Sequence, residues 1–170
     1  MKSNTLIFFF ALLISTVSAQ NDAVDRFFSK YLDHDDFTAV VISPKMFNMM
    51  ASGLEGNDET EFKEVIKNIK SLKILTANDK DQKYFKEFIN KLPKSEYEVL
   101  LEVREKGQNI KFYTRESGNQ VTELLLLIGG EEFVMMCFGG NLDLNKISKL
   151  AKGMNINGAE HLMKVKDKKK

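Results

Sequence analysis

The sequence predicts an α+β domain in which an antiparallel meander of four strands, residues 97–138, follows a region of alternating helices and short strands. Apolar residues recur every three or four positions before residue 93 and every second position after residue 96. These are the periods of an amphipathic helix and of a half-buried strand. The turns between the later strands are short, which is typical of antiparallel neighbours. We expect two layers, with helices mainly on one face of the sheet and two early strands extending it.

Four helices are predicted before the meander, each with an apolar stripe. The first covers residues 21–32, and the second begins at Ser43-Pro44, an N-cap followed by a first-turn proline. The third opens at Asp58 in a capping pattern, and the fourth is capped by Asp79 and ends at Pro93. The stripes consist of Val24, Phe27, Phe28, Tyr31 and Leu32; Met46, Phe47, Met49, Met50 and Leu54; Phe62, Val65, Ile66 and Ile69; and Tyr84, Phe85, Phe88, Ile89 and Leu92. A last helix is expected over 144–152.

Strands are predicted on both sides of residue 93. Phe37–Ile42 is a short β-branched run typical of a buried strand, and Leu72–Thr76 is a second short strand. The meander strands are expected at 97–105, 109–115, 121–128 and 132–138, with Gly139-Gly140 ending the last one.

Two of these strands, at 124–128 and 133–138, are apolar on both faces. A strand with one face in water alternates in polarity, so these two must be covered on both sides. Helices would cover one side. The other side needs more chain, a second copy, a ligand or a partner.

The N-terminus has the layout of a cleavable secretory signal. Lys2 precedes an unbroken apolar run from Leu6 to Ile14, and Val17 and Ala19 occupy the −3 and −1 positions of a cleavage site before Gln20. The run is too short for a membrane-spanning helix, which needs about 20 apolar residues. We therefore expect a signal peptide at 1–19, a single α+β domain at 20–160 and a basic, disordered tail at 161–170. The exported chain is expected to be soluble, in the periplasm or secreted, with no transmembrane segment.

Composition excludes some classes of partner. Removal of Lys2 with the signal leaves 24 Lys and Arg against 24 Asp and Glu, so the mature chain is formally neutral. A neutral, mixed surface argues against nucleic acid as a partner. The single cysteine, Cys137, cannot form an internal disulfide, so the fold depends on its apolar core.

Several stretches together resemble a known family. They are Phe28 and Tyr31 in the first helix, VVISPKMF at 40–47, IKSLKIL at 69–75, the run at 97–116, and VTELLLLIGG followed by GGNLDLNKISKLAK within 121–152. Their order and spacing are similar to the family catalogued as domain of unknown function 4252. The resemblance implies exported envelope proteins of Bacteroidota-type Gram-negative bacteria with an α+β fold. It carries no catalytic residues to transfer, and it implies an association with envelope-stress signalling.

The polar candidates for chemistry have simpler structural explanations. Asp33-His34-Asp35-Asp36 is the densest group of metal-ligand types, but it lacks the alternating ligands and turn glycine of a Ca²⁺ loop. His161 has no neighbouring His or Cys. The five lysines from Lys164 to Lys170 would suit anionic lipid or simply aid solubility.

The remaining candidates lie in or beside the meander. Cys137 sits in an apolar run and is expected to be a buried small hydrophobe. Gly129-Gly130 and Gly139-Gly140 form no phosphate-binding motif, and turn chemistry explains them. The glutamates that would make an acid/base pair are Glu123, Glu131 and Glu132. Adjacent residues point apart on a strand, which favours a solvated turn instead. No catalytic, metal or cofactor site is therefore predicted.

Met46, Phe47, Met49 and Met50 form the one predicted binding surface, because Met-rich surfaces adapt to apolar partners. The alternative is that these residues fill the core. The sequence thus favours an exported, non-enzymatic envelope protein that binds a protein partner, a second copy of itself, or an apolar or lipid ligand. Two alternatives stay open: a hydrolase-like enzyme with an unrecognised site, and a regulatory partner in envelope-stress signalling.

Overall fold

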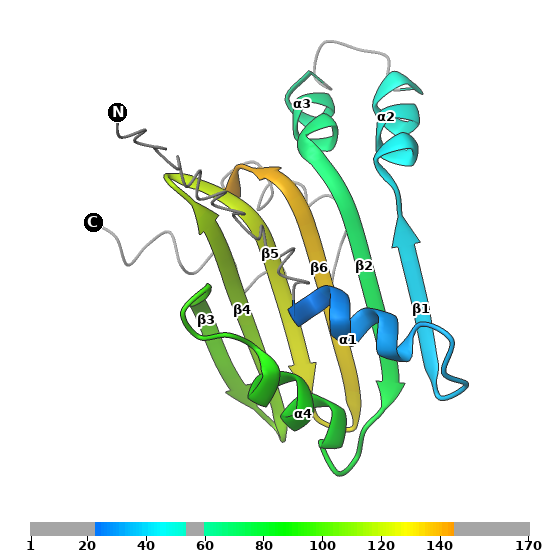
Figure 1. Ribbon diagram of the computed structural model, residues 1–170, viewed down its shortest axis with the longest axis vertical. Helices are drawn as coiled ribbons and strands as arrows, with labels where there is room; N and C mark the ends of the chain where they lie inside the picture. Colours follow the sequence, from blue (N-terminus) through cyan, green and yellow to red (C-terminus); the bar gives the residue numbers. More distant parts are fainter. Residues whose placement is uncertain (1–22, 54–59, 145–170) are drawn as a thin grey trace, which may run out of the picture.

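The computed structural model describes residues 23–53 and 60–144 (Figure 1). Within these two ranges, four helices and six strands follow one another. They are α1 Ala23–Tyr31, β1 Phe37–Ile42, α2 Pro44–Gly53, α3 Thr60–Asn68, β2 Ile69–Asn78, α4 Lys83–Lys91, β3 Tyr97–Glu105, β4 Gln108–Ser117, β5 Gln120–Gly129 and β6 Glu132–Leu142. The protein is α+β, as the sequence predicts.

All six strands form one antiparallel sheet in the order β1-β2-β6-β5-β4-β3. The last four strands are the predicted meander. The two early strands extend it as expected: β2 pairs with β6, and β1 pairs with β2 at the outer edge. The edges of the sheet are therefore β1 and β3, which lie on opposite sides of Figure 1.

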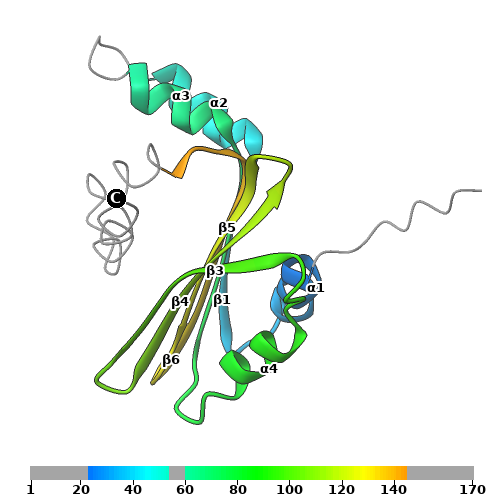
Figure 2. The same cartoon turned by 90° about the vertical axis from the view of Figure 1, so that its left-hand side faces the viewer.

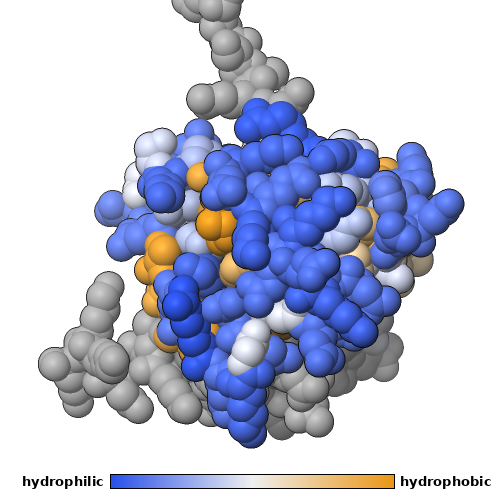
Figure 3. All heavy atoms as spheres, turned by 90° about the horizontal axis from the view of Figure 1, so that it is seen from below, coloured by the Kyte–Doolittle hydropathy of each residue, from blue (hydrophilic) through white to orange (hydrophobic). Residues whose placement is uncertain are grey.

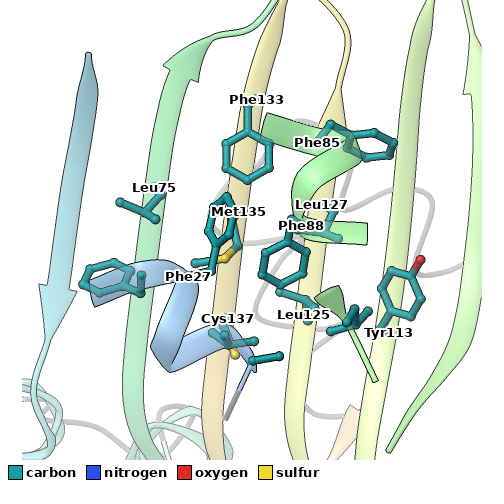
Figure 4. Packing of buried hydrophobic residues seen from close by; sticks show 14 of the residues in the cluster. Phe27, Leu75, Phe85, Phe88, Tyr113, Leu125, Leu127, Phe133, Met135 and Cys137 are labelled. Carbon is teal, nitrogen blue, oxygen red and sulfur yellow. The ribbon is translucent and has the colours of Figure 1, made fainter. Parts of the chain in front are cut away.

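One face of the sheet carries the first core, which α1 and α4 cover (Figures 1 and 4). Aromatic side chains from both helices point toward β2, β6 and β5 in Figure 4. Phe27 of α1 meets Phe88 of α4 edge-on, with ring centroids 4.9 Å apart. The sheet side of this core consists of fully buried residues of β2, β5 and β6: Leu75, Leu125, Leu127, Phe133 and Met135. This face follows the predicted helical stripes except at Leu32, which lies beyond the end of α1 and is exposed.

The opposite face carries the second core, to which α2 and α3 contribute Phe47, Ala51, Val65 and Ile66. Its sheet residues include Phe112, Leu124 and Leu126, which alternate with the first-core residues along β4 and β5. The helices are therefore divided between the two faces. Helices α1 and α4 lie on one side of the sheet, and α2 and α3 extend from one end of the sheet toward its opposite side (Figure 2). The prediction that the helices lie mainly on one face is therefore wrong. Helix α3 continues directly into β2 at Ile69, which holds α3 at the end of the sheet, where its apolar residues join the second core.

Leu124 to Leu127 are all buried, which confirms that this stretch of β5 is covered on both faces.

Two strands are longer than predicted. Strand β2 extends at both ends, and β6 continues through Gly139-Gly140 to Leu142 instead of ending at the glycines. Gly140 stands opposite Ile69 at a register shift, with φ +150°, and a Cβ there would lie 2.2 Å from the Asn68 carbonyl oxygen. This glycine pair thus permits a close approach of two strands rather than a turn.

The Asp79 carboxylate caps α4 as predicted, but not from the N-cap position: α4 begins at Lys83, and its N-cap residue is Gln82, which makes no side-chain capping hydrogen bond. The buried Asp79 carboxylate accepts hydrogen bonds from the backbone N–H groups of Tyr84 at 3.1 Å and Phe85 at 3.0 Å. It thereby satisfies two donors at the helix N-terminus.

Several predictions fall outside the described residues. They concern the signal peptide at 1–19, the cap at Asp58, the last helix beyond Leu144, His161 and the basic tail at 161–170.

Candidate functional site: an apolar edge formed by β1 and α2

Exposed apolar side chains gather in one short part of the chain. Within residues 23–53 and 63–144, seven large hydrophobic side chains are exposed, and six of them lie between residues 32 and 50. We call these six the apolar edge: Leu32, Val40, Val41, Met46, Met49 and Met50. The seventh is Val99 on β3. The opposite end of the molecule from α2 has a mostly hydrophilic surface with small hydrophobic spots (Figure 3).

The start of α2 is fixed by local sequence. The Ser43 hydroxyl accepts a hydrogen bond from the Met46 N–H at 3.4 Å, and the Ser43 carbonyl accepts one from the Phe47 N–H at 3.2 Å. Pro44 occupies the first helical position, where its missing N–H costs nothing. This cap sets which side of the helix faces the protein.

The two sides of α2 are both apolar. Phe47 and Ala51, four positions apart, are buried in the second core. Met46, Met49 and Met50, with i, i+3 and i+4 spacing, form a second stripe that is 50%, 61% and 43% exposed. The predicted binding surface is thus divided: its three methionines are at the surface, and Phe47 belongs to the core. A helix that serves only as core cover carries one apolar stripe.

β1 differs from its predicted state. The sequence predicts a buried strand, yet Val40 and Val41 are exposed because β1 is the outermost strand of the sheet. Successive strand residues point to opposite faces, so these two valines present apolar surface on both faces at the same edge. Between Phe37 and Gly53 the only charged residue is Lys45. The apolar edge is therefore nearly free of charge.

The loop of Asp33, His34, Asp35 and Asp36 leads into β1 and is exposed. His34 Nδ1 lies 3.7 Å from Asp36 Oδ2 and accepts a hydrogen bond from the Asp36 N–H at 3.3 Å. No group of three His, Cys, Asp or Glu side chains suited to a metal ion occurs within the described ranges. The loop is a charged turn at one end of the apolar edge.

A polar cluster that the sequence did not predict lies at the margin of the first core. It consists of Glu123, Tyr97, Arg115 and Cys137. The Tyr97 hydroxyl donates to Glu123 at 2.5 Å, and Arg115 pairs with Glu123 across β4 and β5. The Cys137 sulfur lies 4.0 Å from Glu123 Oε2. A reactive thiol is favoured by a neighbouring positive charge that stabilises the thiolate, whereas the negative charge of the Glu123 carboxylate disfavours the thiolate. Buried Cys137 fits its predicted role as a small hydrophobe. The alternating pattern of β4 and β5 predicts each face, but only the register pairs Arg115 with Glu123.

Glu131 and Glu132 are exposed at the β5–β6 hairpin, and the Glu131 carbonyl accepts a hydrogen bond from the Asp79 N–H at 2.8 Å. The structure does not bring either side chain to Glu123, which lies at the other end of β5. Gly129, at the same hairpin, packs against the Phe85 ring. These residues shape the hairpin.

A second polar cluster joins α1 to α4. Glu87 accepts hydrogen bonds from Lys30 at 2.7 Å, from the Tyr31 hydroxyl at 2.7 Å and from Lys91 at 2.8 Å. Partial burial opposes ionisation of Glu87, but these three donors outweigh it and lower the pKa of Glu87 to about 2. Burial raises the pKa of Tyr31 in the same cluster. The cluster holds the two helices together over the first core.

A family model described as a domain of unknown function, DUF4252, matches residues 30–150. The chain belongs to the DUF4252 family. No curated protein and no solved structure matches it. The residues of this DUF4252 protein that the family model matches include both edge strands of the sheet and the whole apolar edge. The candidate site therefore lies within the family domain.

No helix in the described part of this DUF4252 protein is both long and apolar enough to cross a membrane. The exposed apolar side chains are confined to a strand and a short helix at the sheet edge. Such a surface suits contact with another protein chain, through backbone pairing on the strand and side-chain packing on the helix.

Proposed function

We propose that this DUF4252 protein is an exported, non-enzymatic binding protein whose apolar edge docks onto a protein partner. The observation that carries the proposal is the gathering of Leu32, Val40, Val41 and the three exposed methionines of α2 along one edge. Exposed apolar side chains scattered singly are ordinary, but a group of them marks an interaction site.

A protein partner suits this surface better than a small apolar ligand. Small ligands bind in concave, mainly apolar pockets that bury most of their surface. Three of the hollows in the described part lie away from the apolar edge and contain many polar or charged residues. One is lined by Lys94, Ser95, Glu96, Tyr97, Glu98, Thr114 and Glu116; one by Gln82, Arg104, Glu105, Lys106, Gly107, Gln108 and Asn109; and one by Ala23, Arg26, Phe27, Lys30 and Lys91.

Export is supported by the signal-like sequence of residues 1–19. N-terminal sequencing of the protein from its source cells is expected to begin at Gln20. A mature chain that still begins at Met1 would contradict the export part of the proposal.

The binding part is tested by photo-crosslinking in the source cells. A photoreactive amino acid placed at Met49 or Val41 is expected to form covalent adducts with a protein, because both side chains face outward from the apolar edge. Val99 is the matched control, since it is apolar and half exposed but lies on the other sheet edge. Adducts at Val99 as abundant as those at Met49, or none at either edge position, would overturn the proposed function.

A further inference from the structure

We propose that the partner of the apolar edge is a second copy of this chain, and that the two β1 strands pair antiparallel to join two sheets into one. This inference rests on the proposed function and identifies its partner. The argument comes from the backbone of β1, from the absence of edge protection and from the charges at the two ends of the strand.

The backbone of β1 offers an open pairing surface. β1 is hydrogen-bonded to β2 on one side only, since it is the last strand of the sheet. Six residues of strand span about 20 Å. Such an edge presents a row of N–H and C=O groups to an added strand. Because every neighbouring pair in this sheet is antiparallel, an antiparallel addition continues the same pattern.

Within residues 23–53 and 60–144, β1 lacks the devices that prevent strand addition. Natural edges are protected by charges, prolines, bulges or cover. Phe37–Ile42 contains no charge and no proline, and its register with β2 runs without interruption from Phe37↔Ala77 to Ile42↔Leu72. Each of the four other strand pairings has a register shift. The other edge, β3, has four charged residues and a shift between Val99 and Leu101.

The strand is complementary to itself. In a symmetric pair the residues that face each other must point to the same side, so the two-fold axis passes beside Ala39 or Val40. Centred on Val40, the pair sets Val41 opposite Ala39 and Ile42 opposite Thr38. All of these side chains are uncharged. No like charges are brought together, which is a requirement for a surface that binds its own copy.

The two ends of β1 are complementary in charge, and this favours a second copy over an unrelated strand. Lys45 lies just beyond one end, beside the exposed methionines, and Asp33, Asp35 and Asp36 lie just before the other end, beside Leu32. Antiparallel pairing sets each end against the opposite end of the other copy. It brings Lys45 of one chain to the acidic turn of its partner, twice, and α2 alongside Leu32. The pairing therefore includes Val40 and Val41 and brings the methionine end of one chain to the Leu32 end of the other.

The first test is the oligomeric state of the mature chain, residues 20–170, by sedimentation velocity over a range of concentrations. We expect a reversible dimer. Val41→Lys is expected to make it monomeric, and the matched control Val99→Lys to leave it dimeric. A wild-type monomer at every concentration, or a dimer that Val41→Lys leaves intact and folded by circular dichroism, would overturn the inference.

The second test uses charge exchange at exposed positions, where substitutions leave folding intact. Lys45→Asp places like charges at both ends of the pair, and we expect the dimer dissociation constant to rise about tenfold. Adding Asp35→Lys to the same chain is expected to restore most of the affinity. A dissociation constant that Lys45→Asp leaves unchanged, or a rise that Asp35→Lys does not reverse, would contradict the arrangement.

The third test fixes the register. In a Cys137→Ala chain, a cysteine at position 39 or 40 is expected to give a disulfide-linked dimer, because facing residues of an antiparallel pair have Cα atoms about 4.5–5.5 Å apart. Val99→Cys is the control and is expected to stay unlinked. Linkage at Val99 alone would overturn the inference. If photo-crosslinking at Met49 captures a different protein and the purified chain is monomeric, the proposed function stands and only the second copy is wrong.

Discussion

The first core and the apolar edge are both built from apolar residues, yet they serve opposite purposes. Under α1 and α4, aromatic side chains such as Phe27, Phe88 and Phe133 are almost completely buried and meet ring to ring. Along β1 and α2, unbranched methionines and short valines stand in solvent. Large rings lose little conformational freedom and stabilise a fixed interior, whereas methionine adapts to a second surface. Apolar residues that stabilise the monomer are thus separable from those left available to a partner.

The sharpest test of this difference is Phe88→Ala in the first core. Phe88 is 1% exposed and packs edge-on against Phe27. Deleting the ring is expected to lower the free energy of unfolding by about 3–5 kcal/mol through lost burial and a residual cavity. Urea denaturation followed by circular dichroism measures it. A loss below about 1 kcal/mol would show that α4 is not anchored as the structure indicates.

Gly129→Ala is expected to have the next largest effect. A Cβ at this position would lie 2.4 Å from the Phe85 ring, so the ring or α4 must shift. The expected loss in the free energy of unfolding is about 1–3 kcal/mol. Gly118→Ala is an instructive control: no atom lies within 4 Å of its Cβ position, and its φ of +64° strains an alanine without any clash. A smaller loss at Gly129 than at Gly118 would contradict the packing described.

Glu87→Gln tests the polar cluster that holds the first layer together. The pKa of Glu87 is about 2 in the folded protein, below its ordinary value of 4.5. A lowered folded pKa contributes stability above the unfolded pKa, and that contribution is lost as the pH falls through the folded pKa. We expect a loss of about 1–2 kcal/mol at pH 7, since Lys30 and Lys91 are more than half exposed and solvent screens them. Unfolding measured from pH 7 to pH 2 should show the two proteins converging. A constant difference over this range would exclude the assigned role.

Met49→Lys, on the apolar edge, is expected to have the smallest effect on stability. Met49 is the most exposed of the six edge side chains, so the free energy of unfolding should change by no more than about 0.5 kcal/mol. Binding should nevertheless weaken, because a charge replaces adaptable apolar surface. A large loss in the free energy of unfolding, with association unchanged, would show that Met49 stabilises the monomer and takes no part in binding.

Much of the fold was predictable from local patterns. The stripe of Val24, Phe27 and Phe28 and the alternation of Ile110 and Phe112 each follow from local geometry along the chain. The candidate site was only half predictable. The run of methionines in α2 was visible, but helical spacing alone could not show that Phe47 points inward while Met46, Met49 and Met50 point outward.

Local sequence patterns were sufficient to predict the type and order of the helices and strands, the antiparallel meander and the resemblance to a family with this architecture. Hydrophobic period, caps and turn residues act over a few positions, so they can be read without the fold. Tertiary structure alone decided that β1 is an edge strand rather than a buried one, that the helices are divided between two cores, and that Arg115 pairs with Glu123. Each of these depends on the order and register of strands far apart in the chain, and a β-branched run such as FTAVVI suits a central strand and an edge strand equally well.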